Sequence, residues 1–484
     1  MKKSLPYFKR TLLTLIALMT MGSAVNAEVL SVTYKAGEVP SESSTFDPYT
    51  TPLTFEALED ETTISIDNKL GKTIEYSTDG GSTWVSTSEM SIAISGIAAG
   101  TKVCLRGDNA AYGTLSGDGT TIKFDKDCYV YGNVMSLISS TGFATLTTLA
   151  GDAAFRKMFN NNVHFVSHNT KDLVLPATTL TYGCYNSMFA GSTIRRAPEL
   201  PATTIARDCY YAMFTYCKNL KAAPALPATK MEQDCYHGMF EGCQALTEAP
   251  ALPATELDWN CYENMFRNTG LTEGPALPAT ELAYGCYEGM FWECKSLTKA
   301  PALPATTLAN RCYTYMFYMC SSLANAPELP ATTLKNNCYS SMFYGCTSLE
   351  KAPVLPAPVL VTSCYSYMFT NCTKLNFVEC LATDLSANNV ESEWMWGTCQ
   401  WLYGVAETGT FIKAEGVNDW TEGIHGIPTG WTVETPTGIR TIEKGKSIMG
   451  NAIYDLSGRR VANPSNNIYV VKGKKVIITN GQNN

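Results

Sequence analysis

The chain has 484 residues, too many for one ordinary core, so we expect several structural units. Asp and Glu (44) outnumber Lys and Arg (36), for a formal net charge of -8, and the repeats described below carry no Lys/Arg stripe, which argues against nucleic acid as a partner. Beyond the first residues no stretch reaches 18 apolar residues, so we predict no transmembrane segment in the mature chain.

Residues 1–27 have the pattern of a secretory signal peptide. Four Lys and Arg side chains precede the apolar run 11–21, and Ala27 ends a small-residue cleavage site. The run is too short to span a bilayer as a permanent helix. We therefore predict an exported protein, at the outer cell surface or extracellular. Its net charge falls from -8 to -12 on cleavage (32 basic against 44 acidic side chains).

Residues 28–135 are predicted to form an all-β sandwich domain. Short runs of alternating apolar and polar residues, such as 63–67, 91–95 and 121–124, are separated by Gly, Asp and Asn. About 100 residues of this kind are enough for a separate core. Residues 136–153 are assigned as a connection.

One predicted hairpin in this domain contains a short motif. The segment Ser77-Thr-Asp79-Gly-Gly81-Ser-Thr83-Trp84 resembles the Asp-box hairpins of sialidase propellers, in which the box is structural. Asp tolerates the turn and binds its backbone, while Gly supplies positive φ. One copy on about 100 residues of strand is too little for a propeller, so we interpret it as a structural hairpin and do not predict sialidase activity.

The tripeptide Arg106-Gly107-Asp108 is like the one that integrins bind. It follows a predicted strand at a Gly-Asp-Asn turn, and we favour the interpretation as a strand-end turn. Its function is left open.

The sequence from 154 to 400 is dominated by a repeat, Cys-Tyr-x-x-Met-Phe-x-x-Cys-x-x-Leu-x-x-Ala-Pro-x-Leu-Pro-Ala-Thr-x-Leu. The Cys-Tyr pair recurs in steps of 25, 26, 26, 25, 26, 26 and 26 residues, at Cys184, Cys209, Cys235, Cys261, Cys286, Cys312, Cys338 and Cys364. A fixed period of this length predicts a solenoid, in which each coil buries its apolar side against its neighbours.

A second cysteine follows eight residues after the first in six of the eight copies. The two copies without it, 184–194 and 261–271, are also one residue short. Because cysteine and length vary together, we predict a buried turn residue with a specific local geometry.

The spacing i, i+4, i+8 would place Cys, Met and Cys on one stripe of a helix, with Tyr and Phe on the adjoining stripe. Helices about 8 to 10 Å apart could not be bridged by disulfides, whereas extended coils stacked near 4.8 Å could. Eighteen cysteines in an exported chain usually indicate a disulfide framework. We favour ladders of buried thiols and leave the oxidation state open.

Degenerate copies flank the eight full ones. Ala154-Phe155-Arg-Lys-Met158-Phe159 precedes them, and Met395-Trp396-Gly-Thr-Cys399 follows them. Such copies are expected to seal the open ends of a solenoid.

The repeat resembles the BspA-like leucine-rich repeats of bacterial surface proteins. The resemblance implies an α/β solenoid, leucine-rich-repeat-like, of 25–26-residue coils with a short strand on the concave side of each coil. One departure is the proline at the strand position, as in Leu297-Thr-Lys-Ala300-Pro301-Ala-Leu303. Proline has no N–H for a ladder, so we predict a sheet only two or three residues wide.

Residues 401–436 are predicted as a β cap, and 437–484 as a linker with a small C-terminal β module. The tail, with Ile453-Tyr-Asp-Leu-Ser-Gly-Arg459 and the strand-like run 468–478, resembles the sorting domain of type IX secretion substrates. A plain terminal β-hairpin is the alternative.

No catalytic residue, metal ligand or cofactor site is predicted. His164 and His168 lack acidic or cysteine partners at metal spacing and are interpreted as loop residues. Aromatic side chains at variable positions of the repeat are the candidate binding residues, because they bury area at little entropic cost; shielding of coil edges is the alternative. They are Tyr216, Trp292, Tyr318, Tyr344, Tyr211, Tyr315 and Tyr367.

We therefore expect a non-enzymatic, adhesin-like surface protein that acts as a monomer and binds an extracellular protein or glycan. The alternatives are a glycan-capturing or glycan-degrading component with a sugar-binding sandwich domain, and a structural surface spacer.

Overall fold

The computed structural model describes residues 46–389 and 392–435 and, beyond these, the backbone of four short strands. The predicted signal peptide lies outside the described residues. Within the described part of the chain there are strands, turns and four short 3-10 helices, η1 (Val134–Leu137), η2 (Phe143–Thr145), η3 (Ser386–Asn388) and η4 (Glu393–Met395), but no α-helix. None of those helices has the length or apolar character needed to cross a membrane.

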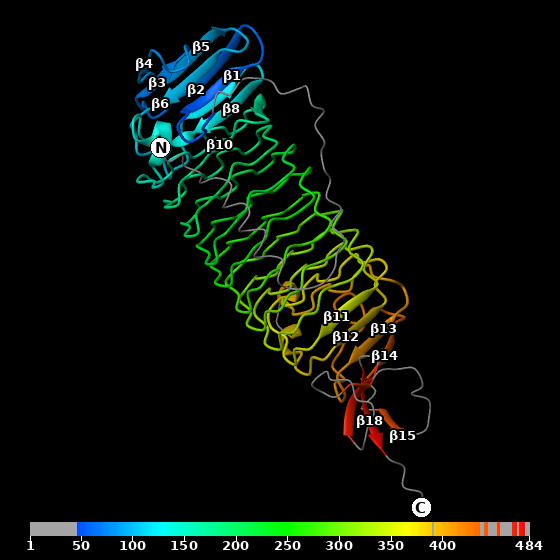
Figure 1. The fold of residues 1–484 in the computed structure, drawn as a ribbon. Helices are drawn as coiled ribbons and strands as arrows, with labels where there is room; N and C mark the ends of the chain where they lie inside the picture. Colours follow the sequence, from blue (N-terminus) through cyan, green and yellow to red (C-terminus); the bar gives the residue numbers. More distant parts are fainter. Residues whose placement is uncertain are drawn as a thin grey trace, which may run out of the picture. The chain divides into compact units, whose positions relative to one another are not determined.

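The first part of the fold consists of two sheets around one core (Figure 1). The smaller sheet has the order β5-β2-β7, from β2 (Thr62–Asp67), β5 (Ser91–Ile97) and β7 (Thr121–Phe124). The larger sheet contains β1 (Leu53–Ala57), β3 (Ile74–Ser77), β4 (Val85–Thr87), β6 (Lys102–Arg106) and β8 (Cys128–Asn133). Phe55 of β1 meets Phe124 of β7 with ring centroids 5.0 Å apart, so the two apolar faces share a core.

The larger sheet continues into the region of repeats. Strands β9 (Phe165–Ser167) and β10 (Leu173–Val174) both pair parallel with β8. These residues belong to the insertion after the first degenerate copy, which we had assigned to the solenoid. The first coil is thus hydrogen-bonded to the sheet.

The two short motifs of the first domain are engaged internally. Asp79 accepts hydrogen bonds from Ser82 N and Thr83 N (both 2.9 Å), as expected for a structural Asp-box. Arg106, the last residue of β6, pairs with Glu75 (2.5 Å) and lies over the Trp84 ring. The Asp108 carboxylate accepts from Ser140 N and Oγ (2.8 and 2.9 Å). The tripeptide therefore lies at the end of β6, in a segment without a regular turn, and its two charged groups already have partners.

Each Cys-Tyr-x-x-Met-Phe-x-x-Cys stretch folds as a chain of tight turns, which we call the turn segment (for example 183–192). Alternate N–H groups bond within the coil: Asn186, Met188 and Ala190 donate to the carbonyls of Gly183, Tyr185 and Ser187. The others bond to the next coil: Tyr185, Ser187 and Phe189 donate to Cys209, Tyr211 and Met213. Every backbone N–H group of the segment therefore finds a partner although no helix or ladder forms.

The helical segments implied by the resemblance are absent because of the residue at every fourth position. Three positions of each copy have a positive φ: the residue before the first cysteine and the residues three and seven after it, as at Gly183, Ser187 and Gly191. These φ values lie between 50° and 72°. Of the 24 such positions in eight copies, 14 are Gly, Asn or Asp (seven, five and two), residues that tolerate the left-handed region and disfavour helix. The predicted i, i+4, i+8 stripe survives because the turns repeat every four residues.

The stripe builds columns of identical side chains through the stack. Tyrosines from Tyr185 to Tyr365 stack with ring centroids 5.7 to 6.0 Å apart, and phenylalanines from Phe189 to Phe369 at 5.4 to 5.8 Å. These rings, and the Met and Cys side chains between them, are buried. The predicted solenoid core is therefore confirmed, at a coil spacing typical of extended rather than helical chains.

All 18 cysteines are buried free thiols. Second-column thiols lie 2.9 to 3.1 Å from a phenylalanine carbonyl of the preceding coil, as Cys217 Sγ does from Phe189 O and Cys320 Sγ from Phe291 O. In the two short copies, Ser192 and Thr269 occupy the same place and contact Cys217 and Cys294. The specific turn geometry predicted from sequence is therefore present.

The strand position is narrow in most of the coils in which proline occupies it; β11 (Lys351–Leu355) is an exception, a five-residue strand with an irregular register at Pro353. In most coils it is reduced to single bridges, such as Arg196↔Ala222 and Glu273↔Lys299, narrower than the two or three residues we predicted. Where Glu379 replaces the proline, β12 (Phe377–Cys380) pairs along its whole length with β13 (Thr410–Lys413). β11 and β14 (Thr432–Glu434) complete this parallel sheet.

Both ends of the stack are covered by aromatic rings. Phe155 and Phe159 stack on Tyr185 and Phe189, each at 5.6 Å, as the first degenerate copy predicts. At the other end Trp401 follows Tyr365 (6.3 Å), and Trp420 of the cap stacks on Trp401 (5.6 Å).

The register that we predicted for the last copy is wrong. Tyr365 N donates to Gly397 O, and Phe369 N to Trp401 O. Gly397 therefore takes the cysteine place and Trp401 the methionine place, whereas Met395 is 49% exposed. The segment Met395-Trp396-x-x-Cys399 matches the sequence motif, but the insertion before it shifts the register. As a result the large ring of Trp401 stacks below Tyr365 and closes the core.

The C-terminal module is a four-stranded sheet of order β15-β18-β17-β16. Its strands are β15 (Arg440–Glu443), β16 (Ile453–Tyr454), β17 (Asn467–Val471) and β18 (Lys474–Thr479). It is therefore larger than the plain hairpin considered as the alternative.

Candidate functional site

The candidate binding residues all lie on the outer face of the turn segments. We define this face as the positions two, three, six and seven residues after the first cysteine of each copy, since the cysteine, Tyr, Met and Phe between them point inward and are buried. Tyr211 is at the second position, Tyr315 and Tyr367 at the third, and Tyr216 at the seventh. The sixth position holds Trp292, Tyr318 and Tyr344.

Four of the seven come together in three consecutive coils. The Trp292 ring lies 5.0 Å from Tyr315 and 4.7 Å from Tyr318, and Tyr318 stacks on Tyr344 at 4.6 Å with an 11° interplanar angle. We call these four residues the aromatic cluster. Arg267, one coil earlier, places its guanidinium 4.3 Å from the centre of the Trp292 ring. The rings support one another and keep part of their surface open.

The other three predicted residues stand apart from the cluster. Tyr211 stacks on His237 (4.6 Å, 14°), and Tyr367 faces Trp394 at 6.4 Å. Tyr216 is 51% exposed and lines a hollow nearer the first domain. The seven candidate residues therefore share the outer face, but the sequence did not show which of their side chains contact one another.

A group of charged residues lies in the coils that precede the cluster. His237 Nδ1 is 3.6 Å from Asp234 Oδ1 and 3.5 Å from Glu263 Oε2. Burial lowers the pKa of His237, but the two carboxylates raise it by more, so the net shift is upward. In the next coil Glu288, 8% exposed, accepts 2.8 and 2.5 Å hydrogen bonds from Arg311. Carboxylates beside aromatic rings suit the hydroxyl groups and the apolar face of a sugar.

One coil of the cluster has large side chains at all three of its left-handed backbone positions, whereas the next coil has small residues or Asn there. Arg311, Tyr315 and Met319 occupy its three left-handed positions, with φ of 61°, 56° and 59°. The next coil has Asn337, Ser341 and Gly345 there. Each large side chain in this region costs about 1 kcal/mol or more relative to Gly. Such strain is commonly found at functional sites.

Sequence reasoning missed two exposed aromatic residues at the edge of this face. Trp259 and Tyr284 are 58% and 41% exposed, with ring centroids 6.1 Å apart. Both stand two residues before the cysteine of consecutive copies, so aligning the copies at that position would have found them.

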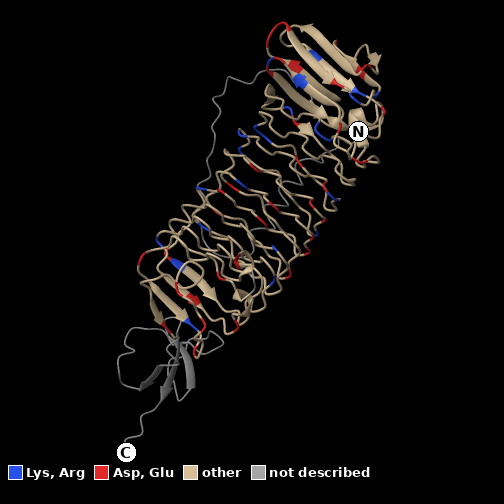
Figure 2. Cartoon of the chain, turned by 180° about the vertical axis from the view of Figure 1, so that it is seen from behind, with Lys and Arg blue, Asp and Glu red and all other residues tan. Residues whose placement is uncertain are grey.

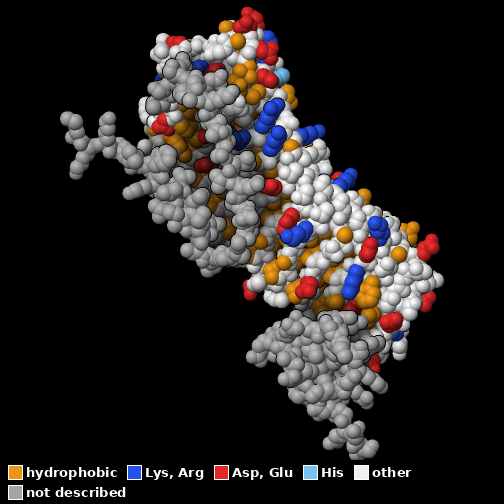
Figure 3. Space-filling model, turned by 45° about the vertical axis from the view of Figure 1, so that its right-hand side comes forward, with side chains coloured by type: hydrophobic (Ala, Val, Ile, Leu, Met, Phe, Trp, Pro, Cys, Tyr) orange, Lys and Arg blue, Asp and Glu red, His pale blue; other side chains and the backbone are white. Residues whose placement is uncertain are grey.

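Charge is segregated along the stack, although its sum over the repeats is small. Residues 154–230 contain nine Lys and Arg against three Asp and Glu, whereas residues 231–294 contain one against eleven. Figure 2 shows both signs along the coils, and Figure 3 shows hydrophobic side chains among them on one face of the stack. The stack therefore offers a basic and an acidic section to a partner.

The two histidines considered as metal ligands have other contacts. His164 Nδ1 is 2.9 Å from Asp127 Oδ1, and His168 Nδ1 lies 3.1 Å from Thr170 N. The His168 ring packs against Tyr129 at 4.6 Å, and burial, followed by Lys171, lowers the pKa of His168. Within the described residues no group of His, Cys, Asp or Glu could hold a metal ion.

Comparison with known proteins gave no match: no family model, no curated protein and no solved structure is similar to this chain at a significant level.

Proposed function

We propose that this is a non-enzymatic, adhesin-like protein of the outer cell surface whose repeat stack binds an extracellular glycan or protein. The observation that carries the proposal is the aromatic cluster. Trp292, Tyr315 and Tyr318 lie with ring centroids 4.7 to 5.7 Å apart, and Tyr344 stacks on Tyr318 at 4.6 Å, on the outer face of an otherwise uniform scaffold. Stacked, part-exposed rings supply contact area at little entropic cost.

The proposal takes the chain as a leucine-rich-repeat-like solenoid that follows a β-sandwich module, in line with the resemblance to BspA-like proteins. A monomer suffices, since one chain carries the whole cluster. Glycan is the partner that we favour, because a carboxylate lies beside the rings: Glu293 Oε1 accepts a 3.2 Å hydrogen bond from Trp292 Nε1.

A glycan array probed with the mature protein tests the proposal. We expect binding that falls at least tenfold in the Trp292→Ala/Tyr318→Ala double variant. Trp394→Ala is the matched control, because Trp394 is 69% exposed and lies outside the cluster. Equal binding by the double variant and the control would show that the aromatic cluster is not the site. Absence of all glycan and protein binding would favour a structural spacer.

A glycan-degrading role is the alternative that the neighbouring carboxylates favour. It requires two carboxyl groups placed on either side of a glycosidic bond. Hydrolysis of any glycan that binds, lost in the Glu263→Gln variant, would overturn the non-enzymatic proposal.

We further propose that the C-terminal module directs export to the surface, as its resemblance to type IX sorting domains implies. Cell fractionation with mass spectrometry of both mature ends tests this together with the predicted signal cleavage. A chain truncated after residue 436 is expected to be absent from the outer surface, and its normal surface display would contradict the sorting role.

A further inference from the structure

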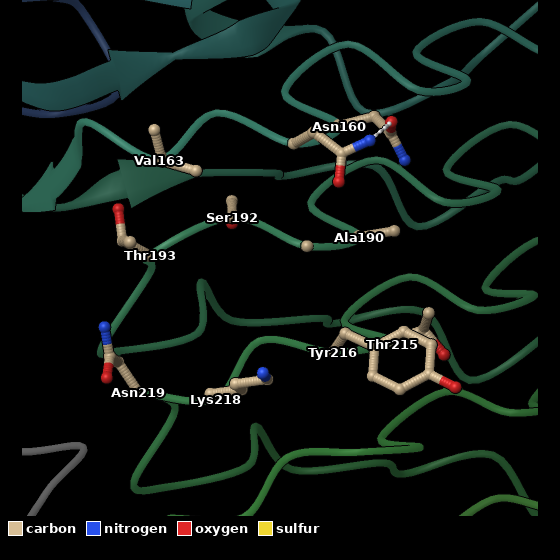
Figure 4. Close-up of a pocket in the computed structure, with 11 residues that line it drawn as sticks. Asn160, Val163, Ala190, Ser192, Thr193, Thr215, Tyr216, Lys218 and Asn219 are labelled. Atoms are coloured by element: carbon tan, nitrogen blue, oxygen red, sulfur yellow. Dashed lines mark hydrogen bonds between the residues drawn. The ribbon is translucent and has the colours of Figure 1, made fainter.

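A hollow of about 590 Å³ opens between the first coils, at the other end of the stack from the aromatic cluster (Figure 4). Asn160 and Val163 form one wall, residues 190–193 the floor, and residues 215–219 the other wall. Its origin is visible in the sequence. The short copy has Ser192-Thr193-Ile194 where the next has Cys217-Lys218-Asn219-Leu220, so a missing residue leaves space between two coils.

Tyr216 forms a fixed platform in this hollow. Its backbone is left-handed (φ 55°), and its ring lies against Gly242 of the next coil, where any Cβ would collide with it. The hydroxyl group lies 3.3 Å from Glu241 Oε1, which fixes the ring in its plane. One face of the ring is packed, and the side chain remains 51% exposed toward the hollow. A ring held in this way suits stacking against the apolar face of a pyranose.

Most polar groups around the hollow are already used. Thr193 Oγ1 and Thr215 Oγ1 donate to the carbonyls of Phe165 and Gly238, and the Asn161 amide donates to Asn160. The Lys218 amine and the Asn219 amide have no partner among the described residues and lie on one wall (Figure 4). They are two adjacent donors, one of them charged.

The charge of this section favours an anionic ligand. Among the described residues that line the hollow, Lys218 is the only charged one; the nearest carboxylate, Glu241, is held at the Tyr216 hydroxyl. The surrounding residues 154–230 carry nine basic side chains against three acidic ones. An anion would gain from this field, and a cation would be repelled.

We propose that the hollow binds a pyranose unit that carries a carboxylate, with the sugar ring on Tyr216 and the carboxylate at Lys218 and Asn219. The site is distinct from the aromatic cluster, because two whole coils, those of Cys235 and Cys261, lie between the hollow and the cluster. Either site can therefore fail without the other.

Calorimetric titration of the purified full chain tests the proposal with two probes, a glucuronic acid disaccharide and its neutral glucose counterpart. The uronic probe should bind at least tenfold more tightly, and added salt should reduce the difference. Lys218→Gln should abolish the preference. Tyr216→Gly should abolish binding of both probes without lowering the melting temperature, since Gly relieves the left-handed backbone.

Met319→Gly is the matched control, because Met319 has φ 59° and lies over Gly345 as Tyr216 lies over Gly242. It should leave binding unchanged. Equal binding of the two probes, a preference retained by Lys218→Gln, or tighter binding of a sulfated disaccharide would each overturn the assignment. In the Trp292→Ala/Tyr318→Ala variant, unchanged uronic acid binding is expected, which separates this test from that of the proposed function.

Discussion

The two sides of the turn segments differ in how much they vary from coil to coil. On the inner side, the same Cys, Tyr, Met and Phe recur in every full copy, and each of these side chains is at most 2% exposed. On the outer side, the sixth position alone changes from Glu241 to Arg267, Trp292, Tyr318 and Tyr344. Both sides share one backbone and one set of hydrogen bonds. The scaffold therefore constrains the inner side and leaves the outer side free for recognition.

The reason is the spacing between coils. An inner ring must match the ring above and the ring below at about 5.7 Å, so a change in one copy disturbs two others. An outer side chain has water on one side and needs no identical neighbour. Stability is expected to depend on the inner columns and binding on the outer face.

The largest effect should come from alkaline pH, which acts mainly on the inner columns, where most of the buried thiols lie. Burial raises the pKa of Cys184 and Cys312 to about 12, above the ordinary thiol value of about 8.5. The unfolded chain releases these protons at lower pH than the folded chain. The contribution of each thiol to stability is therefore complete below about pH 8.5 and is lost as the pH rises toward 12, at roughly 1.4 kcal/mol per pH unit.

With a column of such thiols, we expect the melting temperature to fall steeply from pH 8.5 to 10.5. Thermal unfolding followed by circular dichroism measures this. A melting temperature that stays constant to pH 11 would show that the thiols are not buried as described.

The next effect compares one residue from each side. Phe291→Ala removes a fully buried ring from the phenylalanine column and should cost about 3 to 5 kcal/mol of unfolding free energy. Trp259→Ala removes a ring that is 58% exposed and should change stability by no more than about 0.5 kcal/mol. Denaturant unfolding of both variants checks the contrast. Similar losses would contradict the division into an inner and an outer side.

Much of the fold could be predicted from the sequence, because the same packing pattern of inner residues recurs in every copy of the repeat. The coil period, the buried columns and the sealing copy at Phe155 and Phe159 were predictable from spacing alone. The strand position also reflects proline chemistry: pairing is regular at Glu379 and irregular at Pro353 of β11. Inner residues are predictable because every copy must satisfy the same packing.

The misses have a common cause, which is that spacing does not define backbone conformation. A four-residue period fits helix and consecutive turns alike, and only the Gly, Asn and Asp residues at every fourth place distinguish them. In the last copy the sequence motif placed Trp396 in the repeat register, whereas in the structure Trp401 packs against the preceding coil. Of the candidate site, the face was predictable. The meeting of Trp292, Tyr315, Tyr318 and Tyr344, and the hollow at Tyr216, depended on the stacking of particular coils.

The smallest expected effect separates the two sulfur columns of the inner side. In the first column the Cys312 thiol has only a weak contact, 4.0 Å from Cys338 O, and the degenerate copy has Ala154 in this place. In the second column Cys320 donates to Phe291 O at 3.0 Å, and the short copies have Ser192 and Thr269 there. The first place is therefore apolar, and the second needs a donor.

Serine and alanine should consequently rank in opposite order at the two positions. Cys312→Ser buries a hydroxyl group without a good partner and should be less stable than Cys312→Ala by about 1 kcal/mol. Cys320→Ser keeps a donor for the carbonyl and should be more stable than Cys320→Ala by a similar amount. Four denaturant titrations give the two differences, and each column controls for the other. The same order in both columns would mean that the two sulfur positions are chemically equivalent and that the cysteine-to-hydroxyl exchange of the short copies has no bonding cause.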